Sequence, residues 1–182
     1  MKKNSIKVLI IMGILLVAYF VYINREIYGN DNESIIKVIQ RKKYSDNKDI
    51  IIVGVEEVDD FKIAGFFTSG YPGVAIFEKN NKNNFCLKSI KWENQIDNSP
   101  GSAASFIIDY GIDNKAYIVI SNGYEIVTTS LMLNDKYMYS EKMPLNEPSM
   151  VIFNIDNNIK AEFAKFEAYD MNGEVVKLKN SN

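Results

Sequence analysis

Hydrophobic and polar positions follow three different patterns along the chain. An apolar run from Val8 to Ile23 contains no charged residue. Between residues 30 and 47, apolar residues recur at helical spacing, and from Asp49 onward short apolar runs alternate with polar, glycine-containing turns. The pattern predicts an apolar N-terminal helix, one short amphipathic helix and a β-rich body.

The apolar run is long enough to anchor the chain in a bilayer. Between its two ends the helix would rise roughly 24 Å at 1.5 Å per residue. Ile6 and the aliphatic stem of Lys7 extend this length toward the hydrocarbon thickness of about 30 Å. The sequence therefore predicts a transmembrane anchor over residues 1–24, in contact with the lipid bilayer through residues 6–23.

Charged residues on either side of the run predict its orientation. Lys2, Lys3 and Lys7 precede or begin it, whereas Arg25 after it is offset by Glu26. Because positive flanks stay on the cytoplasmic side, we expect a cytoplasmic N-terminus and an extracytoplasmic body at the cell membrane. The alternative is a cleaved signal that releases a secreted body, although the bulky residues ending the run do not form a small-residue cleavage site. A buried core helix is a further alternative.

The amphipathic segment is expected to form one short helix. Ile35, Val38 and Ile39 share a face at helical spacing. Asn30 and Glu33 form a candidate capping pair at its start.

The remainder predicts an α+β, mainly β fold, with an antiparallel β-meander or sandwich-like sheets after the two helices. Short connections favour antiparallel neighbours. The polar stretch 93–103 divides the body into residues 25–98, a short helix with a four-stranded antiparallel sheet, and residues 102–182, a second antiparallel half that could share its core. Residues 161–169 have features of both helix and strand, and we favour a strand because a hairpin signal, Asp170–Gly173, follows. The runs expected as strands are 49–58, 61–68, 74–80, 84–92, 104–110, 116–122, 125–133, 136–140, 149–155, 161–169 and 174–179.

Composition argues against most enzyme chemistry. The sequence has no histidine and one cysteine, Cys86. The usual general base at neutral pH is therefore missing, and neither an intramolecular disulfide nor a thiolate zinc cluster can form. We interpret Cys86 as a packed or half-packed thiol, and we expect a non-enzymatic protein without cofactor or metal.

The charge of the body disfavours a nucleic-acid partner. Three of the 21 basic residues lie at positions 2, 3 and 7, which leaves 18 against all 23 acidic residues and a net charge of −5 from Arg25 onward. Nucleic-acid binding requires a basic face, so we expect no such partner.

One stretch, AGFFTSGYPGVAIFEKN, has the polar and glycine residues of a reactive or phosphate-holding loop. No lysine follows its glycines at the spacing of a phosphate loop, and Ser69 lacks the surrounding glycines of a nucleophile elbow. Pro72 and Gly73 instead suit the central positions of a type II turn. We therefore predict two strands and their connection.

Acidic clusters could bind calcium or supply a pair of acid and base. They lie at Glu56–Asp60, Asp109–Asp113 and Asp170–Glu174. None has the full ligand spacing of a calcium loop, and we interpret all three as hairpin turns.

Aromatic residues suggest a contact surface. Tyr137 and Tyr139 lie two apart and would share one face of a strand, and Tyr71 would lie at a hairpin tip. Exposed tyrosines are frequent at binding hot spots, whereas half-buried tyrosines are common in sheets.

The layout resembles that of small uncharacterised membrane-anchored extracytoplasmic proteins of Bacillus- and Clostridium-like Gram-positive bacteria. The resemblance rests on the anchor and short helix, then IIIVGVEEVDDFKIAGFF, PGVAIFEKNNKNNFCLKSI, YIVISNGYEI and YDMNGEVVKL. It implies location and architecture, with no activity to transfer. We expect a membrane-anchored β-rich module with a binding or accessory role in the cell envelope, contacting an envelope protein or peptide. An immunity or inhibitor protein that intercepts a peptide or enzyme at the membrane is the first alternative. A carboxylate- or metal-dependent enzyme is the second.

Overall fold

The computed structural model describes residues 11–20, 26–42, 49–68, 71–92, 103–111, 114–124, 126–155, 159–176 and 178–180. These residues form a mainly β structure with antiparallel sheets and two short helices, one over residues 11–20 and α2 over Asn32–Arg41. The predicted mainly β, α+β class is confirmed at this level.

The described strands form three four-stranded sheets. Sheet A has the order β1 (Ile50–Val58), β2 (Phe61–Thr68), β3 (Tyr71–Lys79), β4 (Phe85–Trp92). Sheet B has the order β12 (Leu178–Asn180), β5 (Ala103–Tyr110), β6 (Asn114–Ser121), β9 (Ser149–Phe153). Sheet C has the order β11 (Val175–Val176), β10 (Ala164–Tyr169), β7 (Thr128–Leu133), β8 (Tyr137–Lys142). All pairings within the sheets are antiparallel except that of β12 with β5, which is parallel.

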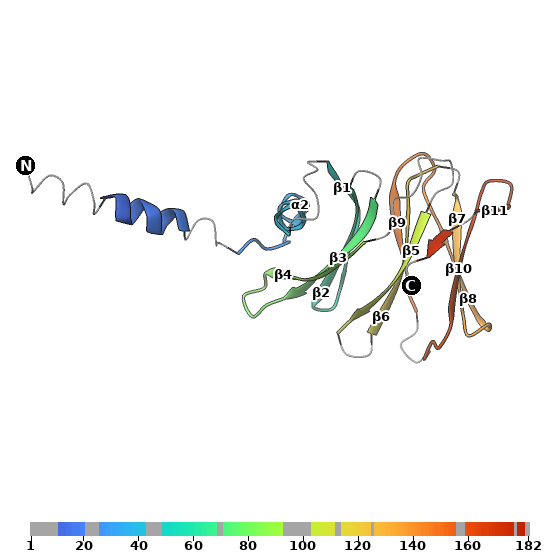
Figure 1. The fold of residues 1–182 in the computed structure, drawn as a ribbon. Helices are drawn as coiled ribbons and strands as arrows, with labels where there is room; N and C mark the ends of the chain where they lie inside the picture. Colours follow the sequence, from blue (N-terminus) through green and yellow to red (C-terminus); the bar gives the residue numbers. More distant parts are fainter. Residues whose placement is uncertain are drawn as a thin grey trace, which may run out of the picture.

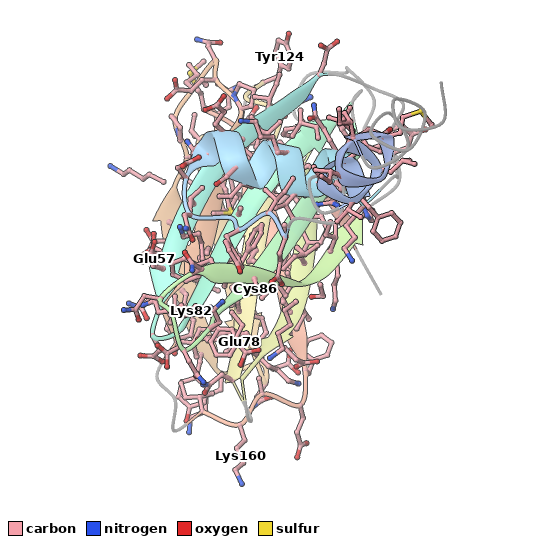
Figure 2. All side chains as sticks on the ribbon, turned by 90° about the vertical axis from the view of Figure 1, so that its left-hand side faces the viewer. Glu57, Glu78, Lys82, Cys86, Tyr124 and Lys160 are labelled. Carbon is pink, nitrogen blue, oxygen red and sulfur yellow. The ribbon has the colours of Figure 1, made fainter. Side chains whose placement is uncertain are left out.

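The elements are stacked in layers in the order α2, sheet A, sheet B and sheet C (Figure 1). Helix α2 lies across the outer face of sheet A, as the view from that side shows (Figure 2). Its predicted apolar face is confirmed, because Ile35, Val38 and Ile39 are buried there against Phe66 and Phe77 of sheet A.

Sheet B is the central layer and is covered on both faces. Phe106 and Ile118 pack with Ile63 of sheet A, whereas Tyr117 packs with Leu131 of sheet C. Burial on both faces accounts for the nearly continuous apolar runs of β5 and β6, because a strand covered on two sides needs apolar side chains at successive positions. By contrast, sheet C is covered on one face only by the residues that the structure describes, and that face packs on sheet B.

The start of α2 differs from the predicted capping pair. The N-cap is Asp31, whose Oδ1 accepts from the Ser34 backbone N–H at 2.8 Å, and the Ser34 hydroxyl group lies 3.0 Å from the Asp31 backbone N–H. Asn30 is instead bonded to the sheet, where its Oδ1 accepts from the Phe85 N–H at 2.9 Å. Spacing alone could not separate two adjacent residues that both suit an N-cap.

The predicted type II turn at Pro72 and Gly73 is wrong. Both residues lie inside β3, where Pro72 opposes Phe67 and Gly73 opposes Phe66 of β2. Pro72 is tolerated because it is the second residue of the strand and precedes the pairing with β4, which begins at Gly73 opposite Trp92. The connection itself falls at residues 69–70, outside the described residues.

Most other strand predictions agree with the structure. The favoured strand at 161–169 is confirmed as β10, and a turn at Asp170–Gly173 joins it to β11, with Gly173 at φ +80°. Several bounds differ. Strand β3 begins at Tyr71 rather than at residue 74, β7 at Thr128 rather than at residue 125, and β10 at Ala164 rather than at residue 161. The predicted strand 174–179 is divided into β11 and β12.

The N-terminal helix is described only over residues 11–20. Within the described parts of the chain, neither helix has the length and apolar character needed to cross a bilayer. The predicted span also includes residues 6–10 and 21–23, which lie outside the described residues.

Candidate contact surface

The three tyrosines of the predicted contact surface lie on two different sheets. Tyr71 begins β3 of sheet A and is 43% exposed, whereas Tyr137 and Tyr139 lie on β8 of sheet C, with sheet B between. Tyr137 is 38% exposed, but Tyr139 is half-buried against the core between sheets B and C. The two β8 tyrosines do share one face, and that face is the inner one, since they oppose Leu133 and Leu131. Their role in contact stays a prediction.

The opposite, outer face of sheet C carries a different set of side chains. Because directly paired residues share a face, the pairings of β7 with β8, β10 and of β10 with β11 identify its members. They are Thr128, Ser130, Met132, Met138, Ser140, Lys142, Lys165, Glu167, Tyr169 and Val175. Met138 and Val175 are 64% and 66% exposed, so this outer face presents apolar side chains beside polar ones.

An ordered polar ladder runs along β10 on this outer face. Lys165 Nζ lies 2.8 Å from Glu167 Oε1, and the Tyr169 hydroxyl group donates to Glu167 Oε2 at 2.5 Å. The hydrogen bond from Lys165, followed by that from Tyr169, lowers the pKa of Glu167, and the bond to Glu167 raises the pKa of Lys165. The side chains are solvent-exposed enough that the pair adds little stability. Its consequence is geometric: the carboxylate is held between a cation and a hydroxyl group.

Strand β8 forms an exposed border of sheet C. It pairs with β7 over six residues in unbroken register, and five of the six are exposed. In the sheet order, β8 is terminal, so its other side faces no strand among the described residues. Such a border presents unpaired backbone N–H and C=O groups to solvent.

A buried lysine fixes the chain where it enters the body. Lys62 of β2 is 3% exposed, and its Nζ donates to the carbonyl oxygens of Gly29 at 3.1 Å and Asn30 at 2.8 Å. The same ammonium group lies 3.1 Å from Glu57 Oε1 and 4.1 Å from the centre of the Phe85 ring. The segment before α2 is thereby tied to the middle of sheet A.

A cleft of about 420 Å³ lies beside this entry point. It is lined by Glu26, Ile27, Val38, Arg41, Lys42 and Leu87. Its charges have both signs, and its cations are at the C-terminal end of α2, where the helix dipole already attracts positive charge. The lining therefore selects no particular ligand.

The residues considered for catalysis or metal binding do not come together. No group of three or more histidine, cysteine or acidic side chains is placed to hold a metal within the described residues. Thr68 is buried, and Ser69 lies outside the described residues. Cys86 is a half-buried free thiol whose sulfur lies 3.4 Å from the Asn80 amide nitrogen.

The acidic clusters belong to turns and strand ends wherever they are described. Asp59 and Asp60 connect β1 to β2, with Asp59 at φ +53°. Asp170 accepts from the backbone N–H groups of Asn172 and Glu174, both at 2.8 Å, which closes the turn before β11. Asp113 lies outside the described residues.

Comparison with known proteins adds no relative to this picture. No protein-family model, no curated protein and no solved structure matches the chain.

Tyr137 and Tyr139 of the predicted contact surface lie on β8, and the opposite side of the same strand belongs to the outer face of sheet C. Met138, between the two tyrosines, points outward, and Lys165, Glu167 and Tyr169 recur at a spacing of two on the strand that was hardest to assign. The alternation was visible in the sequence. Which face would be covered depended on sheet B, and that packing is a tertiary feature.

Proposed function

We propose that this protein is a membrane-anchored extracytoplasmic module with a non-enzymatic binding or accessory role in the cell envelope. The observation that carries the proposal is the character of the helix over residues 11–20. Its large apolar side chains are between 54% and 71% exposed, and they are distributed around the whole helix. A helix that is apolar all round requires burial in a protein core or a membrane, and the described part of the body leaves this one uncovered.

The way the chain enters the body supports the same role. Gly29 N–H donates to the Phe85 carbonyl at 2.8 Å, and the buried Lys62 holds the next two carbonyl groups. Gly29 and Asn30 are thereby fixed on sheet A, so an anchor that precedes them would join the body at this end of the stack of layers. Sheet C lies at the far end of the stack from this entry point (Figure 1). An anchored body would thus present its outer face away from the bilayer.

The location is tested by protease accessibility in intact protoplasts that express the full chain with an N-terminal epitope tag. We expect added protease to digest the body and to leave a short tagged fragment that sediments with the membrane. Digestion only after detergent lysis would contradict the orientation. Loss of the tag together with an intact soluble body would indicate the secreted alternative.

The anchor itself is tested by vesicle flotation of the purified full chain. Leu15→Glu places a charge in the middle of the exposed helix, where it disfavours insertion by about 2.5–3.5 kcal/mol on insertion scales for charged residues. We expect this variant to lose most of its flotation, and Glu33→Lys, on the exposed side of α2, to float like the natural chain. Equal flotation of Leu15→Glu and the natural chain would refute the anchor.

A further inference from the structure

The outer side of strand β8 is the most available pairing border in the described structure. Its backbone groups on that side have no partner within the described chain, and its register with β7 contains no bulge. The other borders are less suitable. The β1–β2 and β3–β4 registers each contain a shift, and the start of β4 is bonded to Gly29. Strand β9, at the border of sheet B, has no exposed residue, and β11 and β12 are two and three residues long. A border with these properties readily pairs with another strand.

A second copy of the same chain can pair with β8 only in certain registers. Two adjacent antiparallel strands of identical sequence are related by a two-fold axis perpendicular to the sheet. Rotation about this axis leaves each side chain on its own face of the sheet. Because directly opposite residues share a face and successive residues alternate, the axis must pass between two copies of the same residue. Each choice of central residue fixes every other pair across the axis.

Charge separates the candidate centres. Centres at Tyr137 or Met138 would pair only one or three residues of β8, because residues 134–136 form the turn before the strand. A centre at Tyr139 would bring Lys142 beside Lys136 of that turn in the second copy. A centre at Glu141 would place two glutamates opposite each other, and a centre at Lys142 would do the same with two lysines. Like charges directly opposite destabilise a sheet.

The centre at Ser140 avoids all of these conflicts. Ser140 then faces Ser140 of the second copy, Tyr139 faces Glu141, and Met138 faces Lys142. The first pair can hydrogen-bond, the second places a hydroxyl group beside a carboxylate, and the third lays an aliphatic lysine stem on a methionine. We propose that the chain forms a two-fold dimer through antiparallel pairing of β8 with β8, centred on Ser140, which joins two sheets C into one eight-stranded sheet.

The layered fold makes this dimer compatible with one membrane. The axis is perpendicular to sheet C, and the layers from α2 to sheet C are stacked along that direction (Figure 1). Rotation about the axis therefore leaves both α2 layers at the same end of the dimer, and both chains enter from the same side. The strand pairing does not depend on the proposed anchor, but confinement to a bilayer would raise the effective concentration and strengthen it.

The register is tested by disulfide formation in the full chain, reconstituted in lipid vesicles after Cys86→Ser removes the natural thiol. Residues directly opposite across antiparallel strands have Cβ atoms about 4.5–5.5 Å apart, close to the spacing in disulfides. We expect Ser140→Cys to give a disulfide-linked dimer with mild oxidant. In Met138→Cys and Lys142→Cys, identical positions lie about 14 Å apart along the strands, so each variant alone should form no disulfide-linked dimer. The Met138→Cys, Lys142→Cys double variant should cross-link again.

A second measurement uses association without oxidant. Ser140→Lys opposes two ammonium groups at the axis, and we expect it to abolish the dimer seen by light scattering or single-molecule counting in vesicles. Ser140→Thr is the matched control and should keep it. Equal cross-linking at positions 138, 140 and 142 would indicate random collision and overturn the proposal. The proposal would also be overturned if the natural chain were monomeric in this measurement and the Ser140→Cys variant gave no cross-link. That result would indicate that β8 pairs with a different partner.

Discussion

Gly73 provides a direct test of why glycine occurs in the stretch that the sequence marked as a turn. In a type II turn, glycine would be needed for a positive φ. In the structure, Gly73 is a strand residue, and a Cβ atom added there would lie 2.4 Å from Cζ of Phe66. The Phe66 ring in turn packs edge-on to Trp92, with ring centres 4.8 Å apart. Glycine is therefore required at this position for steric reasons, because the Phe66 ring occupies the space that a side chain would need.

The two explanations predict different substitution patterns. We expect Gly73→Ala to lower the free energy of unfolding by about 1–3 kcal/mol, the usual cost of overpacking a core. Gly73→Asn should cost more, because a larger side chain meets the same ring. Phe66→Leu should lessen the cost of Gly73→Ala, so the two changes should be non-additive in a double-mutant cycle.

Gly173 is the matched control, because there the backbone conformation requires glycine and the space around it does not. It has φ +80°, and an added Cβ would have no heavy atom within 4 Å. We expect Gly173→Ala to cost about 1 kcal/mol through backbone strain, and Gly173→Asn to cost less, because asparagine tolerates the left-handed region.

The assay is urea denaturation of the full chain in detergent, followed by fluorescence of Trp92, the single tryptophan of the sequence. This residue contacts the Phe66 ring directly and therefore reports on the perturbed region. If Gly73→Asn lowers the free energy of unfolding less than Gly73→Ala does, glycine is required for its backbone conformation and the steric explanation is refuted. Additive effects of Phe66→Leu and Gly73→Ala would refute it as well.

Two further predictions concern the entry of the chain into the body. Lys62→Met should lower the free energy of unfolding by about 2–4 kcal/mol, because it leaves the carbonyl groups of Gly29 and Asn30 without their charged donor. Lys62→Arg keeps a charged donor and should lower it less. Urea denaturation measures both changes. Hydrogen bonds from Ser34 lower the pKa of Asp31, so its stabilisation of α2 is complete above the pKa of the unfolded chain and is lost as the pH falls through the folded-state pKa. Amide exchange of α2 in acid should show this loss in the natural chain and not in Asp31→Asn; the same acid response in both would contradict the assignment.

The sequence predicted the sheet content well because the signals for it are local. Strand β2 was predicted with the observed bounds, and the buried face of α2 was read from Ile35, Val38 and Ile39. Alternation, helical spacing and the asparagine-glycine turn before β11 depend on neighbouring residues alone. Capping at Asp31 was missed by one position, since two adjacent residues were both suitable.

The contact role predicted for Tyr71, Tyr137 and Tyr139 stays a prediction. The sequence pointed to β8 through Tyr137 and Tyr139, but their face is the one covered by the core between sheets B and C. Alternation identifies two faces of a strand without indicating which one will be buried. The outer face, with Met138 and the ladder from Lys165 to Tyr169, became recognisable once the layers were placed.

What the sequence determined by itself was the order of elements, the lack of histidine chemistry and the apolar character of the N-terminal segment. The tertiary structure decided which sheets cover one another and why particular residues are needed. Pro72 and Gly73 illustrate the difference, since their local preference for a turn is real but weak. The pairing of β3 with β2, and the Phe66 ring packed over Gly73, outweigh it. Burial of aromatic surface and a continuous hydrogen-bonded ladder together exceed the preference of two residues for a bend.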